Sequence, residues 1–259
     1  MGFEFDAQHY QRASAHQQEW GRRLIAELGL RGDERILDVG CGDGSLTRTL
    51  AAGLPRGSVV GIDASVQMID AARRVQQPPS LRFLHLDVLD ADFRDEFDVV
   101  FSNAALHWVH DHRRLLGVLH RAVRPGGAIR LNFAGDGNCS RLIAVLHELM
   151  AEPPYPPAFR GFTWPWTMPA VDRYERLVAE VPFAAARVWG EVADRHFPSV
   201  EAMVGWIDQP SLVPFRQHLA PATAERFRDA VVARMTARAC EPDGRCFETF
   251  RRINVLARK

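Results

Sequence analysis

Short apolar segments alternate with helix-like segments along the first half of this 259-residue sequence, and this alternation constrains the fold more than any other feature. The apolar segments predict strands at 35–39, 58–62, 81–86, 97–101 and 128–133, and the helix-like segments lie at 7–29, 45–52, 66–75 and 113–122. Strands separated by helices form a parallel sheet joined by right-handed crossovers. The sequence therefore predicts an α/β fold.

Each of the first four predicted strands ends in polar residues, namely the stretch 38–44, Asp63, Asp87 and Asn103. The carboxyl ends of parallel strands lie along one edge of a sheet, and open α/β sheets bind their ligands there. Four such positions in register are harder to obtain by chance than one glycine motif. We therefore expect a ligand site along this edge.

The second half of the sequence is less regular. Pro and aromatic residues are concentrated at 153–169, which predicts a loop or cap rather than a helix or strand. We predict a sixth strand at 188–197, helices at 199–207 and 223–239, and a last strand at 250–258 that closes the sheet.

The charge balance argues against a nucleic-acid partner. Lys and Arg total 32 and Asp and Glu total 32, whereas affinity for nucleic acid comes mainly from neutralising phosphates. No apolar stretch reaches the roughly 18 residues that a membrane span needs, and the first residues lack the pattern of a signal peptide. We therefore expect a soluble protein with a small-molecule partner and no membrane contact.

Cysteine and lysine usage narrows the chemistry further. The four cysteines, Cys41, Cys139, Cys240 and Cys246, show neither a CxxC pair nor the spacing of a zinc site, and the plain interpretation is a reducing cytoplasm. The only lysine is Lys259, which excludes a P-loop lysine and an internal Schiff-base lysine. The sequence therefore predicts a cytoplasmic protein without a metal site.

The glycine turn after the first strand favours a cationic cofactor over a dinucleotide. Gly44 follows two positions after Gly42, so the G-x-G-x-x-G spacing of dinucleotide sites is not met. Asp38, two residues before Gly40, would repel a pyrophosphate but not the ammonium of a methionine moiety. Asp63, at the end of the second strand, suits a ribose diol because a carboxylate accepts two hydrogen bonds.

Five short motifs follow one another along the predicted sheet, at 37–44, at 61–63 with Met68, at 86–88, at 97–100 and at 124–127. They resemble, in this order, the motifs of class I S-adenosylmethionine-dependent methyltransferases, over roughly residues 10–133. The resemblance implies S-adenosyl-L-methionine as the cofactor. It also implies a Rossmann-like, mostly parallel seven-stranded sheet with helices on both faces and a cap of helices and loops.

The resemblance further implies how the cofactor would be held. In the family, the backbone corresponding to 40–44 holds the amino-acid tail, Asp63 binds the ribose hydroxyls, and Asp87 bonds the adenine amine. Met68 and Val88 would flank the adenine, and Asn103 would lie behind the methionine moiety. The full implied set is Tyr10, Asp38, Gly40, Cys41, Gly42, Asp63, Ala64, Met68, Asp87, Val88 and Asn103. The alternative for Asp63 and Asp87 is that they only cap helices.

The segment 102–112 and the helix at 10–17 point to a narrower group. Both are similar to the trans-aconitate and juvenile hormone acid methyltransferases, which methylate carboxylates. Gln17 falls where the juvenile hormone acid enzymes carry a glutamine that binds the substrate carboxylate with a tryptophan matching Trp108. The trans-aconitate enzymes carry a basic residue at the Gln17 position, and this departure argues against a tricarboxylate. The group implies a small carboxylic acid as acceptor.

A carboxylate acceptor needs no general base. A carboxylate with a pKa of about 4 is ionised at neutral pH, so Gln17 and Trp108 need only orient it as neutral donors. A phenol or alcohol, with a pKa of about 10 or more, would need a base, for which His107 is the candidate. Methylation of O, N or C on a natural product is therefore the alternative. Each of these residues also has a plainer interpretation. Trp108 would then pack in the core, Gln17 would lie in solvent, and His107 would have a structural role.

Interpretations from other classes stay open beside this one. A nicotinamide-dependent oxidoreductase lacks both the dinucleotide spacing and an obvious Tyr-x-x-x-Lys pair. A non-catalytic S-adenosylmethionine-binding module would bind the cofactor and transfer no methyl group. A metal site at His107, His110 and His112 is not expected, because their spacing does not put them on one helical face. The aromatic residues of 155–166 line an acceptor pocket or form the core beneath the cap.

We expect a single methyltransferase domain over residues 1–259. Its core would comprise about 30–135, 185–198 and 248–259, and its cap 1–29, 136–184 and 199–247. The sequence predicts neither an oligomeric state nor the identity of the acceptor.

Overall fold

The computed structural model describes residues 15–259, with side chains from residue 19 onward except those of 209 and 210. Seven strands form one sheet in the order β3-β2-β1-β4-β5-β9-β6. Their bounds are β1 Arg35–Val39, β2 Ser58–Asp63, β3 Leu81–His85, β4 Phe97–Asn103, β5 Val123–Ala134, β6 Ala185–Val192 and β9 Arg251–Arg258. Neighbours from β3 to β5 are parallel, while β9 runs antiparallel to both β5 and β6. The predicted Rossmann-like, mostly parallel sheet is confirmed.

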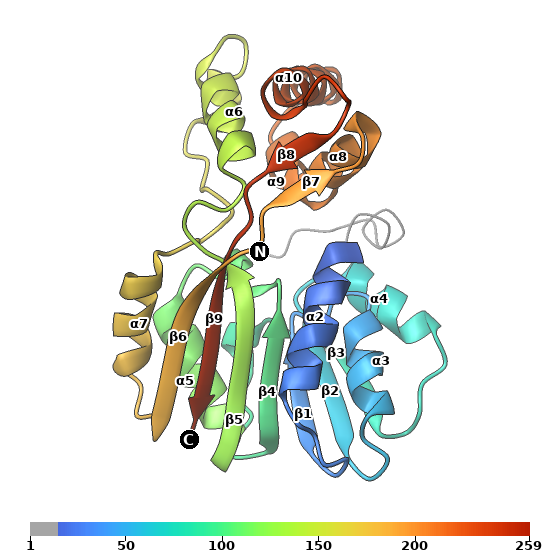
Figure 1. The fold of residues 1–259 in the computed structure, drawn as a ribbon, viewed down its shortest axis with the longest axis vertical. Coiled ribbons are helices and arrows are strands. Elements are labelled where there is room, and N and C mark those ends of the chain that lie inside the picture. Colours follow the sequence, from blue (N-terminus) through green and yellow to red (C-terminus); the bar gives the residue numbers. More distant parts are fainter. Residues whose placement is uncertain (1–14) are drawn as a thin grey trace.

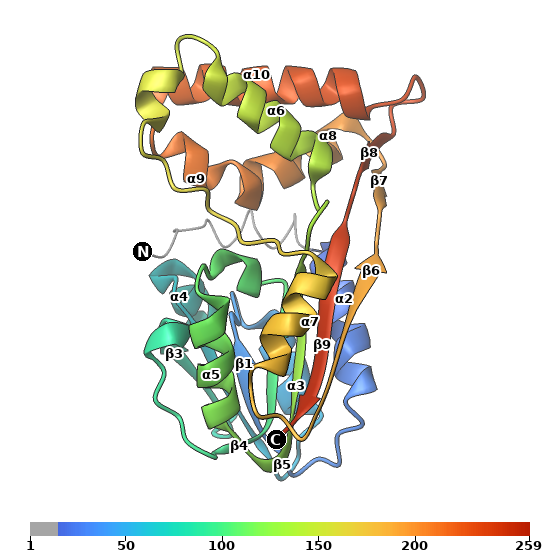
Figure 2. The ribbon, with the colours of Figure 1, turned by 90° about the vertical axis from the view of Figure 1, so that its left-hand side faces the viewer.

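Helices cover both faces of the sheet (Figures 1 and 2). Helices α2 (Ala15–Glu27), α3 (Ser45–Ala52) and α4 (Val66–Arg74) lie on one face, and α5 (His112–Ala122) and α7 (Val171–Ala179) lie on the other. Each face has its own apolar cluster, one containing Leu24 of α2 and the other containing Tyr174 of α7. The sheet is thus buried on both sides, as a parallel sheet must be.

Two helices of the core, α4 and α5, begin where the sequence provides a capping side chain. Ser65 accepts a hydrogen bond from Met68 N at 3.3 Å and starts α4, and Asp111 accepts one from Arg114 N at 2.9 Å and starts α5. Such caps satisfy backbone donors that the first turn of a helix leaves open. The predicted bounds of these helices are therefore met to within one residue.

A second group of elements stands above the carboxyl ends of the strands (Figure 2). We call it the cap; it comprises α6 (Ser140–Ala151), α8 (Val200–Trp206), α9 (Val213–Arg216), α10 (Pro221–Ala239) and a small sheet of β7 (Arg195–Phe197) and β8 (Cys246–Glu248). The remaining short helical turns are η1 (Val88–Asp90), η2 (Leu106–Trp108), η3 (Pro156–Phe159) and η4 (Ile207–Ser211). The cap has an apolar cluster of its own, rich in Trp and Phe.

Three expectations about the arrangement of the elements need correction. The strand expected at 188–197 is split, because β6 pairs with β9 in the large sheet whereas β7 pairs with β8 in the small one. Helix α2, expected within the cap, lies on the core sheet instead, where Leu24 is fully buried. Helix α7, also expected in the cap, packs on β6 and buries Tyr174 and Val178 in the core cluster.

Helix α6 is held at its start by a carboxylate that comes from β8. Glu248 is fully buried, and its two carboxylate oxygens accept hydrogen bonds from Arg141 N at 3.2 Å and Leu142 N at 2.9 Å. A carboxylate at this position satisfies open backbone donors and faces the positive end of the helix dipole. The start of α6 therefore depends on a residue more than a hundred positions away.

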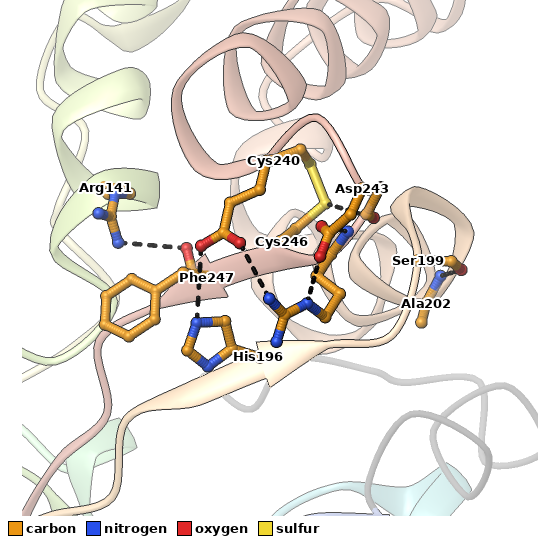
Figure 3. Close-up of a disulfide and its surroundings, with 11 residues drawn as sticks. Arg141, His196, Ser199, Ala202, Cys240, Asp243, Cys246 and Phe247 are labelled. Atoms are coloured by element: carbon orange, nitrogen blue, oxygen red, sulfur yellow. Dashed lines mark hydrogen bonds and ion pairs between the residues drawn. A yellow bond between two sulfur atoms is a disulfide. The ribbon is translucent and has the colours of Figure 1, made fainter.

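A disulfide joins Cys240 at the end of α10 to Cys246 at the start of β8 (Figure 3). It closes a turn in which Arg245 donates to Asp243 at 2.7 Å. The cysteine spacing, interpreted as typical of a reducing cytoplasm, did not predict this bridge. No helix in the described part of the chain is long and apolar enough to span a bilayer. The cytoplasmic location stays a prediction.

Candidate functional site

A cavity of about 600 Å³ lies at the carboxyl ends of the central strands. Its wall is built from the ends of β1, β2 and β4, from the loop after β3, from η2 and the residues that follow it, and from the loop between η3 and α7. The described lining residues are Val39, Gly40, Gly42, Ile62, Asp63, Ala64, Ser65, Met68, Leu86, Asp87, Val88, Leu89, Asn103, Ala104, Ala105, Leu106, Trp108, Val109, His110, Asp111, Thr163 and Pro165. The ligand edge expected from the ends of the strands is therefore a real cavity.

The turn after β1 brings bare backbone to the cavity wall. Gly40 has φ +72° and donates its N–H to Ile62 O at 2.8 Å. A Cβ added to Gly40 would lie 2.1 Å from the Cβ of Ala105, so a side chain has no space there. Glycine tolerates both the positive φ and the close approach. Gly40 and Gly42 therefore present peptide groups rather than side chains to a ligand.

Asp63 connects this turn to the start of α4. Its Oδ2 accepts from Gly42 N and its Oδ1 accepts from Ser65 N, both at 2.9 Å. The two backbone hydrogen bonds fix the orientation of the carboxylate at the cavity wall. Ala64 and Met68, which the sequence also predicted, line the cavity beside Asp63.

Asp87 caps a helical turn and also faces the cavity, and its predicted bond to the adenine amine stays a prediction. Its Oδ1 accepts from Leu89 N at 2.9 Å and so caps the short helical turn η1. Asp87 and Val88 also line the cavity. The hydrogen bond from Leu89 N fixes the orientation of the Asp87 carboxylate, just as the hydrogen bonds from Gly42 N and Ser65 N fix that of Asp63.

Asp38 and Cys41, which the sequence placed in the cofactor set, are buried behind the cavity wall. Asp38 is 3% exposed, and its Oδ2 accepts from Thr47 Oγ1 at 2.7 Å. Burial, helped by the nearby charge of Asp63, raises the pKa of Asp38 to about 7 against the opposing effect of the Thr47 hydroxyl. Burial likewise raises the pKa of the Cys41 thiol. Neither side chain lines the cavity.

The end of β4 and the turn η2 form the wall opposite the acidic side. Asn103 lines the cavity, and Ala104, with φ +58°, donates its N–H to Asn132 O at 2.7 Å. The indole of Trp108 also lines the cavity, and its ring meets the ring of Trp166 edge-on at 5.8 Å. This wall is therefore mostly apolar.

The loop between η3 and α7 completes the cavity. Thr163 and Pro165 line it, and the same segment is tied to η2 because Thr167 N donates to His107 O at 2.8 Å. The side chains of His110 and Thr167 add a hydrogen bond of 3.2 Å. Sequence analysis missed Thr163 and Pro165, since only long-range packing brings this loop to the sheet edge. It also missed Ser65, for which the capping position before α4 was an available signal.

The histidines near the site do not converge. His107 does not line the cavity, and its Nδ1 is buried without a hydrogen-bond partner in the described part of the chain. Burial, with contributions from Arg252 and His112, lowers the pKa of His107 to about 3. His112 lies within hydrogen-bonding distance of the Tyr174 hydroxyl at 3.0 Å. Among the described residues, no group of three or more His, Cys, Asp or Glu is placed to hold a metal ion.

Two predicted residues cannot be placed in the cavity. Tyr10 lies outside the described residues. Gln17 lies in α2, but its side chain is outside the described part of the structure. Their predicted contacts with cofactor and acceptor stay predictions.

Comparison with known proteins agrees with this geometry. The family model described as a methyltransferase domain matches residues 37–131. The trans-aconitate 2-methyltransferase of Deinococcus radiodurans is 32% identical over 247 residues, which cover 91% of each chain. The trans-aconitate 2-methyltransferase of Acidovorax ebreus is 28% identical and covers 99% of this chain and 98% of its own.

Solved structures share the fold at lower identity. The YcgJ protein from Bacillus subtilis has a TM-score of 0.63 at 14% identity and covers 93% of this chain and 98% of its own. Phosphoethanolamine N-methyltransferase 2 of Haemonchus contortus, solved with S-adenosyl-L-methionine, has a TM-score of 0.62 at 17% identity and covers 98% of this chain and 56% of its own. The chain therefore belongs to the class I S-adenosylmethionine-dependent methyltransferases, in the group that includes the trans-aconitate 2-methyltransferases, and S-adenosylmethionine is its cofactor.

Proposed function

We propose that the protein transfers a methyl group to the carboxylate of a small organic acid and forms a methyl ester. The observation that carries this proposal is the state of His107, the base that a phenol or alcohol acceptor was expected to need. Its pKa is lowered to about 3 and it does not line the cavity. A carboxylate is already ionised at neutral pH and needs no base. The two named relatives, trans-aconitate 2-methyltransferases, support the same acceptor group.

The residues of the cavity fit the expected cofactor. S-adenosylmethionine, when bound, supplies a methyl group activated by a sulfonium cation. The charged carboxylates in the described lining are those of Asp63, Asp87 and Asp111, and none of the described lining residues is Arg or Lys. An acidic wall favours a cation and disfavours the phosphates of a nicotinamide dinucleotide. We assign the backbone of Gly40 and Gly42 to the amino-acid end.

The nucleoside end follows from the fixed carboxylates. Asp63, oriented by two backbone donors, can accept hydrogen bonds from the ribose hydroxyls. Met68, Asp87 and Val88 line the cavity beyond it and would enclose the adenine. The opposite wall, from Asn103 to Trp108, is left to face the acceptor.

The chain contributes to the reaction mainly by positioning the acceptor and by excluding water. Trp108 carries a neutral indole N–H donor, and Gln17 carries a neutral amide donor. Neutral donors orient a carboxylate without the strong ion pairing that would weaken it as a nucleophile. Thr163 and Pro165 close the cavity from above, and the resulting drier environment strengthens electrostatic interactions inside it. Alignment of an acceptor oxygen with the methyl group then accounts for the rate enhancement.

An acceptor screen with methyl-labelled S-adenosylmethionine tests the proposal. The labelled product should release volatile labelled methanol under mild base, because an ester hydrolyses there and an ether, amine or carbon-methyl product does not. Gln17→Ala should slow turnover while affinity for S-adenosylhomocysteine stays nearly unchanged. A base-stable product whose formation depends on His110, the histidine in the described lining, would instead indicate an acceptor that must lose a proton, and would refute the proposal.

A further inference from the structure

We infer that Cys240 and Cys246 form a reversible redox site, through which small thiols and their disulfides set the stability of the cap. The bridge joins α10, the last helix of the cap, to β8, the strand that leads back towards the core sheet (Figure 3). Neither cysteine is among the described residues that line the cavity, so the inference is independent of the proposed carboxyl methylation. Disulfides in a reducing compartment, where the sequence places this chain, are usually transient and redox-sensing.

The two cysteines of the bridge differ in their exposure. Cys246 is fully buried, whereas Cys240 is partly exposed. Exchange with a small thiol depends on which sulfur the incoming thiolate can reach. We therefore assign Cys240 as the sulfur that is attacked and Cys246 as the sulfur that leaves.

The turn between the cysteines keeps its shape through hydrogen bonds of its own. Glu241 N donates to Arg245 O at 2.7 Å, and Gly244 N donates to Glu241 O at 2.9 Å. Cys240 and Cys246 face each other across this turn as an antiparallel backbone pair. Because these contacts do not involve the sulfurs, the reduced thiols stay side by side and can form the bridge again.

The buried sulfur has a polar neighbour for its reduced form. Gly244 O lies 3.7 Å from Cys246 Sγ, within the reach of an S–H donor. The two cysteines are also only six positions apart, and the opening of so short a loop releases little chain entropy in the unfolded state. Both features let the fold survive reduction, as a reversible site requires.

The other two cysteines do not compete for the bridge. Cys41 and Cys139 are free and buried. Burial raises the pKa of each of these thiols. The thiolate is the form that reacts, so an enclosed and protonated thiol is a poor nucleophile. Exchange with small disulfides is therefore confined to the pair in the cap.

The bridge acts on the part of the cap that holds α6. Cys246 and Glu248 lie two positions apart in β8, so their side chains share one face of the strand, and both are fully buried. Glu248 caps the start of α6, and the ring of His147 in α6 stacks on that of Trp164 at 4.4 Å. An oxidised bridge therefore steadies the helix on which the loop between η3 and α7 packs.

Reduction proceeds by two exchange steps. The thiolate of a small thiol attacks Cys240 Sγ, forms a mixed disulfide and displaces Cys246 Sγ, which takes up a proton. A second thiolate attacks the outer sulfur of the mixed disulfide, and Cys240 Sγ leaves and is protonated. The protein gains two electrons and two protons while two small thiols become one disulfide, and oxidation is the reverse.

Glutathione tests the inference on the full-length chain. Reduced glutathione should open the bridge under native conditions, and oxidised glutathione should close it again, as followed by alkylation and mass spectrometry of Cys240 and Cys246. The melting temperature of the reduced protein should be lower by about 5 °C and should recover on oxidation. A bridge that opens only in urea, thiols that oxidised glutathione leaves unpaired, or equal melting temperatures in the two states would overturn the inference.

A matched pair of variants tests which sulfur is accessible. Under oxidised glutathione, Cys246→Ser should acquire one glutathionyl group at Cys240, whereas folded Cys240→Ser should acquire none at the buried Cys246. Unchanged binding of S-adenosylhomocysteine shows that both variants are folded. Equally fast modification of the two variants, or modification of Cys240→Ser alone, would contradict the assignment of Cys240 as the reacting sulfur.

Discussion

Replacement of Asp38 by Asn should stabilise the cofactor-free protein, and increasingly so at higher pH. Asp38 is buried behind the cavity, and burial raises its pKa from the usual 3.8 to about 7. The folded state therefore holds a proton that the unfolded state releases above pH 4. Stability is complete below the unfolded pKa and is lost as pH rises towards the folded pKa.

The magnitude follows from the two pKa values. A pKa raised from 3.8 to about 7 corresponds to about 4 kcal/mol of unfolding free energy at pH 8, and to about 2 kcal/mol at pH 5. An asparagine amide resembles the protonated acid in shape, does not titrate, and still offers an oxygen to the Thr47 hydroxyl. Asp38→Asn should therefore gain roughly these amounts over the wild type.

Urea denaturation of wild type and variant at pH 5, 6.5 and 8 measures the difference. Thr47→Val is the companion variant, because it removes the hydroxyl donor that favours the ionised form and should lower stability most at pH 8. A difference between Asp38→Asn and wild type that stays constant from pH 5 to pH 8 would refute the reasoning. So would a variant less stable than wild type at pH 8, since that would mean an ionised Asp38 supports the fold.

Three further predictions concern the site and the cap. Asp63→Ala should weaken S-adenosylhomocysteine binding about a hundredfold by calorimetry, because it removes both the ribose acceptor and the partner of Gly42 N; unchanged affinity would contradict the cofactor assignment. His107→Asn should change kcat by less than about threefold across pH 6 to 8, whereas a hundredfold loss would identify His107 as a base. Glu248→Ala should lower the unfolding free energy, measured in urea, by about 3 kcal/mol, because it leaves the N–H groups of Arg141 and Leu142 without their acceptor at a buried helix start. A loss below about 0.5 kcal/mol would show that the cap does not depend on this carboxylate.

Sequence patterns were sufficient for the core sheet because its signals are local. The strand at 35–39 and the helix at 45–52 were predicted with the bounds that the structure has, since an apolar run and a glycine turn mark them. Ser65 and Ser199 start their helices by accepting hydrogen bonds from residues three positions on. Such contacts depend only on neighbours in the sequence and can be read from it.

The cap was less predictable because its signals are distant. Helix α6 follows Cys139, a left-handed residue without a side-chain cap, and is held by Glu248 from β8. The site shows the same division. Asp63 and Asp87 follow from strand ends, but Thr163 and Pro165 reach the cavity only through packing that no local pattern encodes.

The placement of β9 between β5 and β6 has a consequence for how the chain is assembled. In the described sheet β6 pairs only with β9, which follows it by almost sixty residues. A nascent chain can thus pair its five parallel strands early. Strand β6 cannot pair within this sheet until residues 251–258 have left the ribosome. Loss of those eight residues would therefore cost the sheet two strands rather than one.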